Sequence, residues 1–142
     1  MYARQSRVYQ DAQLEAVPRI RVVVALYDRL LASIDGAELA SRSGQIEVRY
    51  TETSRAVEII SALARALDFS SGGEIAAHLD RIYRFAIQRL TEFEVRNDPA
   101  LAQQVRHLID PLATAWRQLE QESAQASATN VEAPAALRAM RF

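Results

Sequence analysis

Residues 18–34 read PRIRVVVALYDRLLASI, and this stretch decides the fold. Its apolar side chains recur at the spacing that places them on one face of an α-helix. They are Ile20, Val23, Val24, Tyr27, Leu30, Leu31 and Ile34. Proline is favoured at the first position of a helix, because it lacks the backbone N–H that would have no helical partner there. The stretch therefore predicts a long helix that begins at Pro18 and ends near Arg42.

Three further apolar stripes with helical spacing follow, over residues 46–67, 75–93 and 101–119. The chain holds only four glycines and four prolines, and they lie mainly between these stripes. Short connections between long helices return the chain beside itself. The predicted fold is all-α, an antiparallel four-helix bundle.

Local signals predict where the last two helices begin. Ser71, Gly73 and Glu74 belong to a capping box, in which the serine hydroxyl and the glutamate each accept from a free amide. Pro99 follows an acidic residue, which repeats the signal for a helix start. Pro111 lies inside the fourth stripe and removes a backbone hydrogen bond, so we expect the last helix to be kinked or split.

Composition narrows the classes of function. The 142 residues are 49% hydrophobic and 25% charged, which favours one compact domain. The net charge of -1 gives no field to hold nucleic acid, and without cysteine there is no disulfide or thiolate chemistry. The longest uncharged apolar stretch, residues 22–27, is too short to span a membrane, and no signal peptide is visible. We expect a soluble cytoplasmic protein with no membrane insertion.

Both ends of the chain lack the helical pattern. Residues 1–16 have no period but carry Tyr2, Val8, Tyr9 and Leu14, so we expect an extended or short helical segment that docks on something. Residues 123–142 are rich in alanine and serine and are expected to form a tail without reliable order. The bundle domain is therefore assigned to residues 1–122.

No catalytic machinery is apparent, and no enzyme activity, cofactor or metal site is expected. His78 is predicted to face solvent on the third helix, as in histidine phosphotransfer or signalling bundles, which is the alternative function. Apolar residues outside the main stripes, such as Ile59 and Leu63, have three interpretations: a generous core, a surface for a partner, or the interface of a homodimer.

Short motifs in a fixed order resemble the FliS family of flagellar secretion chaperones, from Tyr2 to about Leu119. They include Leu26-Tyr27-Asp28, Arg55-Ala56-Val57-Glu58-Ile59-Ile60, Leu67-Asp68-Phe69, Gly72-Gly73-Glu74-Ile75-Ala76, Ile82-Tyr83, Asn97-Asp98 and Trp116. The resemblance implies a helical bundle without enzymatic activity. It also implies binding of the C-terminal segment of flagellin in the cytosol, prevention of its polymerisation, and delivery to the flagellar type III export apparatus, where the gate protein FlhA recognises the complex.

The resemblance further implies a hydrophobic groove in which the disordered flagellin segment becomes helical. By motif, the groove residues are Leu26, Tyr27, Ile59, Ile60, Leu63, Ile75, Leu79, Tyr83 and Leu90. The N-terminal segment with Tyr2, Val8, Tyr9 and Leu14 would act as a lid on the empty groove, because an uncovered apolar patch invites aggregation.

Overall fold

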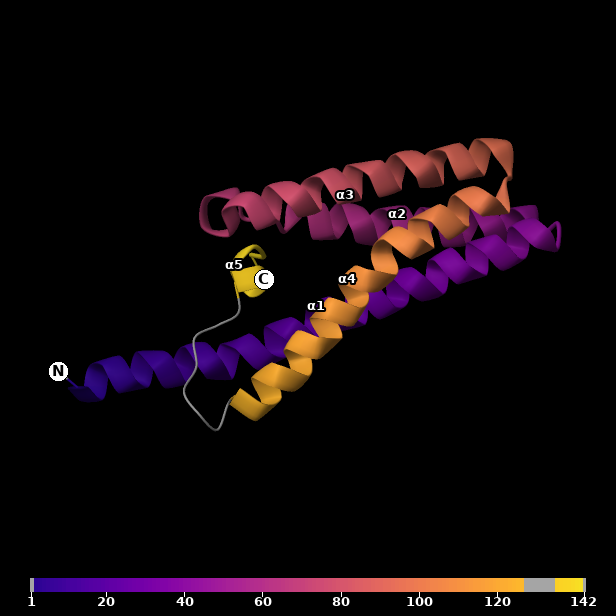
Figure 1. The fold of residues 1–142 in the computed structure, drawn as a ribbon. Coiled ribbons are helices and arrows are strands. Elements are labelled where there is room, and N and C mark those ends of the chain that lie inside the picture. Colours follow the sequence, from indigo (N-terminus) through magenta and orange to yellow (C-terminus); the bar gives the residue numbers. More distant parts are fainter. Residues whose placement is uncertain (1, 127–134, 142) are drawn as a thin grey trace.

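The computed structural model describes the backbone of residues 2–126 and 135–141, and the side chains of residues 16–125 and 135–141. Its helices are α1 (Tyr2–Arg42), α2 (Ile46–Arg65), α3 (Phe69–Arg96), α4 (Pro99–Ala126) and the short α5 (Ala135–Arg138) (Figure 1). The prediction of a helical bundle is confirmed.

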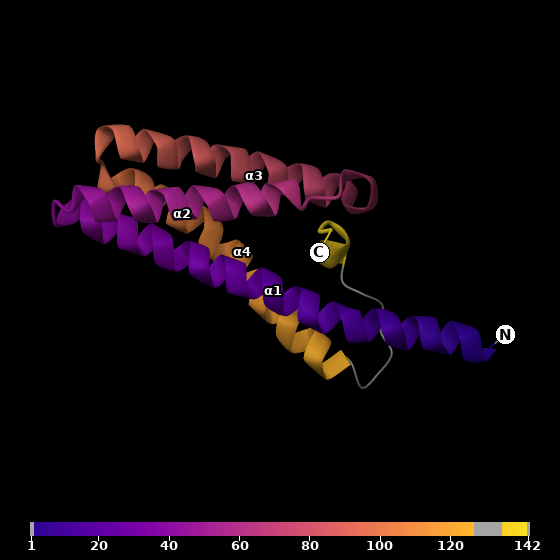
Figure 2. The ribbon, with the colours of Figure 1, turned by 180° about the vertical axis from the view of Figure 1, so that it is seen from behind.

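The four long helices form a closed ring of neighbours. α1 packs against α2 and α4, and α3 packs against the same two helices. The views from both sides show α2 lying along α1, and α3 lying along α2 (Figure 2). The turns between them are tight: Gly44 has a φ of 72° and Asn97 a φ of 52°, in the left-handed region that glycine and asparagine tolerate best.

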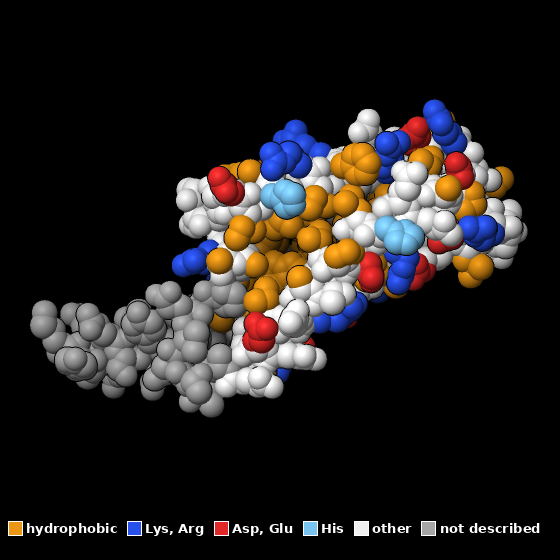
Figure 3. Space-filling view, in the orientation of Figure 1, with side chains coloured by type: hydrophobic (Ala, Val, Ile, Leu, Met, Phe, Trp, Pro, Cys, Tyr) orange, Lys and Arg blue, Asp and Glu red, His pale blue; other side chains and the backbone are white. Residues whose placement is uncertain are grey.

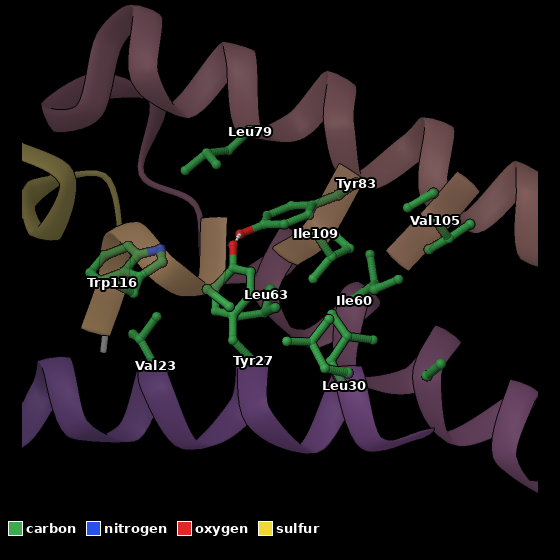
Figure 4. Packing of buried hydrophobic residues seen from close by; sticks show 14 of the residues in the cluster. Val23, Tyr27, Leu30, Ile60, Leu63, Leu79, Tyr83, Val105, Ile109 and Trp116 are labelled. Atoms are coloured by element: carbon green, nitrogen blue, oxygen red, sulfur yellow. Dashed lines mark hydrogen bonds between the residues drawn. The ribbon is translucent and has the colours of Figure 1, made fainter. Parts of the chain in front are cut away.

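The core is the space that these helices enclose (Figure 4). Its largest fully buried side chains come from all four long helices and from α5: Ile20, Val23, Tyr27, Leu30, Ile34, Ile60, Leu63, Tyr83, Leu90, Phe93, Ile109 and Leu137. Burying each such side chain stabilises the fold by about 1.5–3 kcal/mol relative to leaving it in water. Within the described residues, no helix combines the length and the hydropathy that crossing a bilayer requires.

The start of α1 differs from the sequence-based prediction. The helix begins at Tyr2, and Pro18 lies inside it. Residues 2–15 are rich in alanine, arginine and glutamine, which favour helix without any apolar stripe, and one proline removes only one backbone hydrogen bond. The side chains of Tyr2, Val8, Tyr9 and Leu14 lie outside the described residues, so the lid stays a prediction.

The cap of α3 also differs. The carboxylate of Asp68 accepts hydrogen bonds from the backbone N–H groups of Ser70 and Ser71, each at 3.1 Å, and from the Ser70 hydroxyl at 2.7 Å. These hydrogen bonds hold the pKa of Asp68 below its ordinary value, and the bond from the Ser70 hydroxyl has the largest effect. Gly73, with φ 51° and ψ −125°, breaks the helical geometry where the capping box of Ser71, Gly73 and Glu74 would need it. The cap is Asp68.

α4 is one helix that passes through Pro111, and it changes direction along its length (Figure 1). Two ion pairs tie it to α1, between Arg106 and Asp35 and between Arg117 and Asp28, each at 2.5 Å. α4 is therefore bent but not split, and both ion pairs anchor it to α1.

The far end of the tail is ordered, contrary to expectation. α5 packs against α3 and α1, and Leu137, Ala139 and Met140 are at most 2% exposed. A sparse apolar pattern could not order this segment alone, but the bundle supplies the surface that buries it. Residues 135–141 are thus part of the folded unit.

Candidate functional site

An apolar groove runs between the beginning of α3 and the second half of α4. The two helices separate toward the start of α3 (Figure 1), and this face of the molecule is hollowed between apolar walls (Figure 3). The groove has a volume of about 320 Å³. Its lining comes from α3 (Glu74, Ile75, His78, Leu79), α4 (Leu112, Ala115, Trp116, Leu119) and α5 (Ala136).

The groove has an apolar floor and a thin polar rim. Leu79 and Trp116, with 6% and 3% of their surface exposed, form the floor. Ile75 is 40% exposed on the α3 wall. Glu74 and His78 supply the polar rim and are both exposed. Such a groove is suited to an apolar stripe on a peptide helix, because burying carbon surface drives this kind of binding.

A buried pair of tyrosines lies near the floor. The hydroxyls of Tyr27 on α1 and Tyr83 on α3 are 2.5 Å apart and share a hydrogen bond, and Trp116 lies beside this pair (Figure 4). Burial raises the pKa of Tyr27 to about 12 and raises the pKa of Tyr83 as well. Both phenols are therefore neutral at physiological pH. The pair therefore joins α1 to α3 by a hydrogen bond between two neutral groups.

Replacing the tyrosines by phenylalanine, singly and together, should reveal how strongly the two hydroxyls are coupled. Either Tyr27→Phe or Tyr83→Phe leaves the other buried hydroxyl without its partner and should cost about 1–3 kcal/mol. The double variant removes both hydroxyls and should cost less than the sum of the two single changes. Urea unfolding of the three variants measures these losses. Losses that simply add would contradict the coupling of the two tyrosines.

Most of the side chains expected to line a groove lie in the core. Tyr27, Ile60, Leu63, Tyr83 and Leu90 are each 0% exposed. They lie at the centre of the helical stripes, where each side chain points into the bundle. A fully buried side chain presents no surface to a partner in this conformation.

The remaining four expected residues divide into two pairs. Leu26 on α1 and Ile59 on α2 are partly buried against the core and do not line the groove between α3 and α4. Ile75 and Leu79 do line it. Of the residues expected on the third helix, only these two, near its beginning, line the groove, and their contact with a client stays a prediction.

Sequence reasoning missed the opposite wall. Its residues Leu112, Ala115, Trp116 and Leu119 belong to the apolar stripe over residues 101–119, which predicts a helix and no second surface. Ala115 and Trp116 are consecutive apolar residues, so they make the apolar face of this helix wider than a single row. This width was the one sequence feature that indicated a second contact surface. Ala136 carried no signal, because it lies in the segment that was interpreted as a tail.

The two histidines lie apart from each other, and only His78 lines the groove. His78 is exposed on the rim, and His107 Nδ1 bonds the Gln103 carbonyl oxygen, 2.8 Å away on the same helix. Within the described side chains, no three histidine, aspartate or glutamate residues gather in a way that could hold a metal ion.

Comparison with known proteins identifies the kind of chain that carries this groove. The family model described as "Flagellar protein FliS" matches residues 1–123, which include α1 to α3 and nearly all of α4. The chain belongs to the FliS family. All four groove residues that α4 contributes lie within the matched region, whereas α5 lies beyond it.

Curated relatives within the FliS family are named flagellar secretion chaperones. FliS of Vibrio cholerae is 29% identical over 125 residues, covering 88% of this chain and 92% of the relative. FliS of Salmonella typhimurium is 31% identical over 111 residues (78% and 82%), and FliSB of Pseudomonas aeruginosa is 32% identical over 121 residues (82% and 96%). The resemblance inferred from the short motifs is therefore confirmed at the level of the FliS family.

Proposed function

We propose that this chain is a cytosolic chaperone for flagellin. It binds the disordered C-terminal region of the client, prevents premature polymerisation, and escorts the client to the flagellar type III export apparatus, where the gate protein FlhA receives the complex. The observation that carries the proposal is the apolar groove between α3 and α4 in a chain of the FliS family.

The groove suits a segment that folds as it binds. Its floor and walls are almost wholly carbon, so a helix with apolar residues on one face would bury them against Leu79, Trp116 and Leu119. A segment held in this way has its apolar stripe covered. It cannot use the same stripe to pack against other flagellin subunits, which is how binding would prevent polymerisation.

Calorimetry with two forms of flagellin tests the proposal. Coupled folding and binding typically buries about 1,000–3,000 Å² and produces a strongly negative heat-capacity change. Full-length monomeric flagellin should show that signature with this chain, and flagellin that lacks its C-terminal segment should show no binding. Undiminished affinity of the shortened flagellin would refute the mechanism. The isolated C-terminal segment serves as the positive control and should bind alone.

A further inference from the structure

The C-terminal residues 135–141 occupy a fitted site at one end of the groove. The backbone N–H of Asp68 donates to the carbonyl of Ala139 at 2.8 Å, and the N–H of Arg141 donates to the carbonyl of Ala66 at 2.7 Å. The Arg19 side chain donates to the carbonyl of Met140 at 2.9 Å. This segment, called the C-terminal plug below, is thus held by backbone pairing at the α2–α3 connection.

The surface beneath the plug is shaped for it. Leu137 and Met140 are 1% and 2% exposed, so both side chains are inserted into the bundle. A Cβ atom on Gly72 would lie only 2.6 Å from the Cα atom of Ala139, far closer than such atoms approach in proteins. Gly72 therefore permits a contact that any other residue at this position would prevent.

The plug also forms part of the groove. Ala136 lines the groove together with Glu74, Ile75 and His78 at the beginning of α3. A peptide helix that lies between α3 and α4 and extends toward the start of α3 would meet α5. The groove is therefore shorter with the plug in place than the two helices alone would make it.

We propose that the C-terminal plug is an internal competitor of the client, and that flagellin displaces it on binding. This inference rests on the proposed function. A helix as short as α5 has no stability of its own in water, so its order depends entirely on the contacts with the bundle. Tethering keeps its local concentration high, near the millimolar range for short linkers, so the plug returns to its end of the groove when the client leaves.

Three variants separate competition from a structural role. The first ends at residue 134 and lacks the plug. The second, Gly72→Ala, keeps the plug but blocks its docking through the clash with Ala139. Gly36→Ala is the matched control, because its Cβ would meet only the flexible Glu52 side chain, at 3.3 Å, far from the plug. Calorimetry with the C-terminal segment of flagellin gives the affinity of each.

The apparent affinity is the intrinsic affinity multiplied by the fraction of molecules in which the site is free. If the plug leaves its site free in about a tenth to a third of the molecules, removing it should tighten binding by about 3- to 10-fold. Gly72→Ala should reproduce the gain, and Gly36→Ala should leave the affinity unchanged. Hydrogen exchange at the Arg141 amide of the full chain gives an independent readout. The amide should be protected in the free protein and lose protection when the flagellin segment is added.

Two results would overturn the inference while leaving the proposed function intact. One is equal or weaker binding by the chain that ends at residue 134. The other is an Arg141 amide that stays protected in the saturated complex, which would make the plug a permanent part of the fold. If no variant binds the flagellin segment at all, the proposed function fails, and the competition fails with it.

Discussion

Replacing Leu63 by alanine is expected to lower the free energy of unfolding by about 2–5 kcal/mol, the range for large-to-small changes in a packed core. Leu63 is 0% exposed and does not line the groove, so its loss leaves a cavity in the core without removing surface from the groove. The affinity of the fraction that remains folded should change little. Urea unfolding and calorimetry of the same sample measure both quantities.

Ile59→Ala is the matched control for Leu63→Ala. Ile59 lies one turn earlier on α2 and is only partly buried, so its truncation should cost clearly less stability. If Leu63→Ala were no less stable than this control but bound flagellin much more weakly, Leu63 would contact the client, as the motif had implied.

Replacing Ile75 by aspartate is expected to weaken binding of the flagellin segment by about 100-fold or more. The side chain is 40% exposed in the free protein, so a carboxylate there stays hydrated and the fold tolerates it. A bound client helix would cover the carboxylate and leave it without a partner, and an uncompensated buried charge costs about 3–5 kcal/mol. Calorimetry measures the affinity, and thermal unfolding shows that the variant is folded.

Val95→Asp provides the comparison for Ile75→Asp. Val95 lies on the same helix, is 83% exposed and does not line the groove. This variant carries the same added charge and should bind with unchanged affinity. Equal weakening by both substitutions would mean that net charge, and not the groove, governs binding.

The apolar stripes predicted the four long helices because periodicity depends only on which residues face inward. The ends of these helices were harder to predict. Pro18 and Ser71 each carry a signal that permits a helix to begin. However, α1 begins at Tyr2, well before Pro18, and α3 is capped by Asp68, three residues before Ser71. A local signal shows only that a helix can begin at that position. The actual boundary of α1 also depends on the helix propensity of the residues before Pro18, and that of α3 on the non-helical backbone at Gly73.

The groove was only half predictable for a different reason. An apolar stripe indicates which side chains are shielded from water, but it does not indicate whether they pack against another helix or line a groove. Leu90 and Leu79 occupy equivalent positions on the stripe of α3, yet Leu90 lies in the core and Leu79 in the groove, because α4 diverges from α3 toward the latter. The divergence follows from tertiary packing. Residues 135–141 were missed because their burial depends on a surface made by distant parts of the chain.

The ion pairs of the bundle have a consequence for the mechanics of the groove. Arg106 and Arg117 fasten α4 to α1, and Arg49 bonds Glu94 to fasten α3 to α2. Between residues 69 and 125, no ion pair joins α3 to α4. α3 and α4 are thus joined by apolar packing without a charge pair, and the groove lies along this contact. A change in the spacing of the two helices would alter apolar contacts, which have no preferred direction, and would break no ion pair between them.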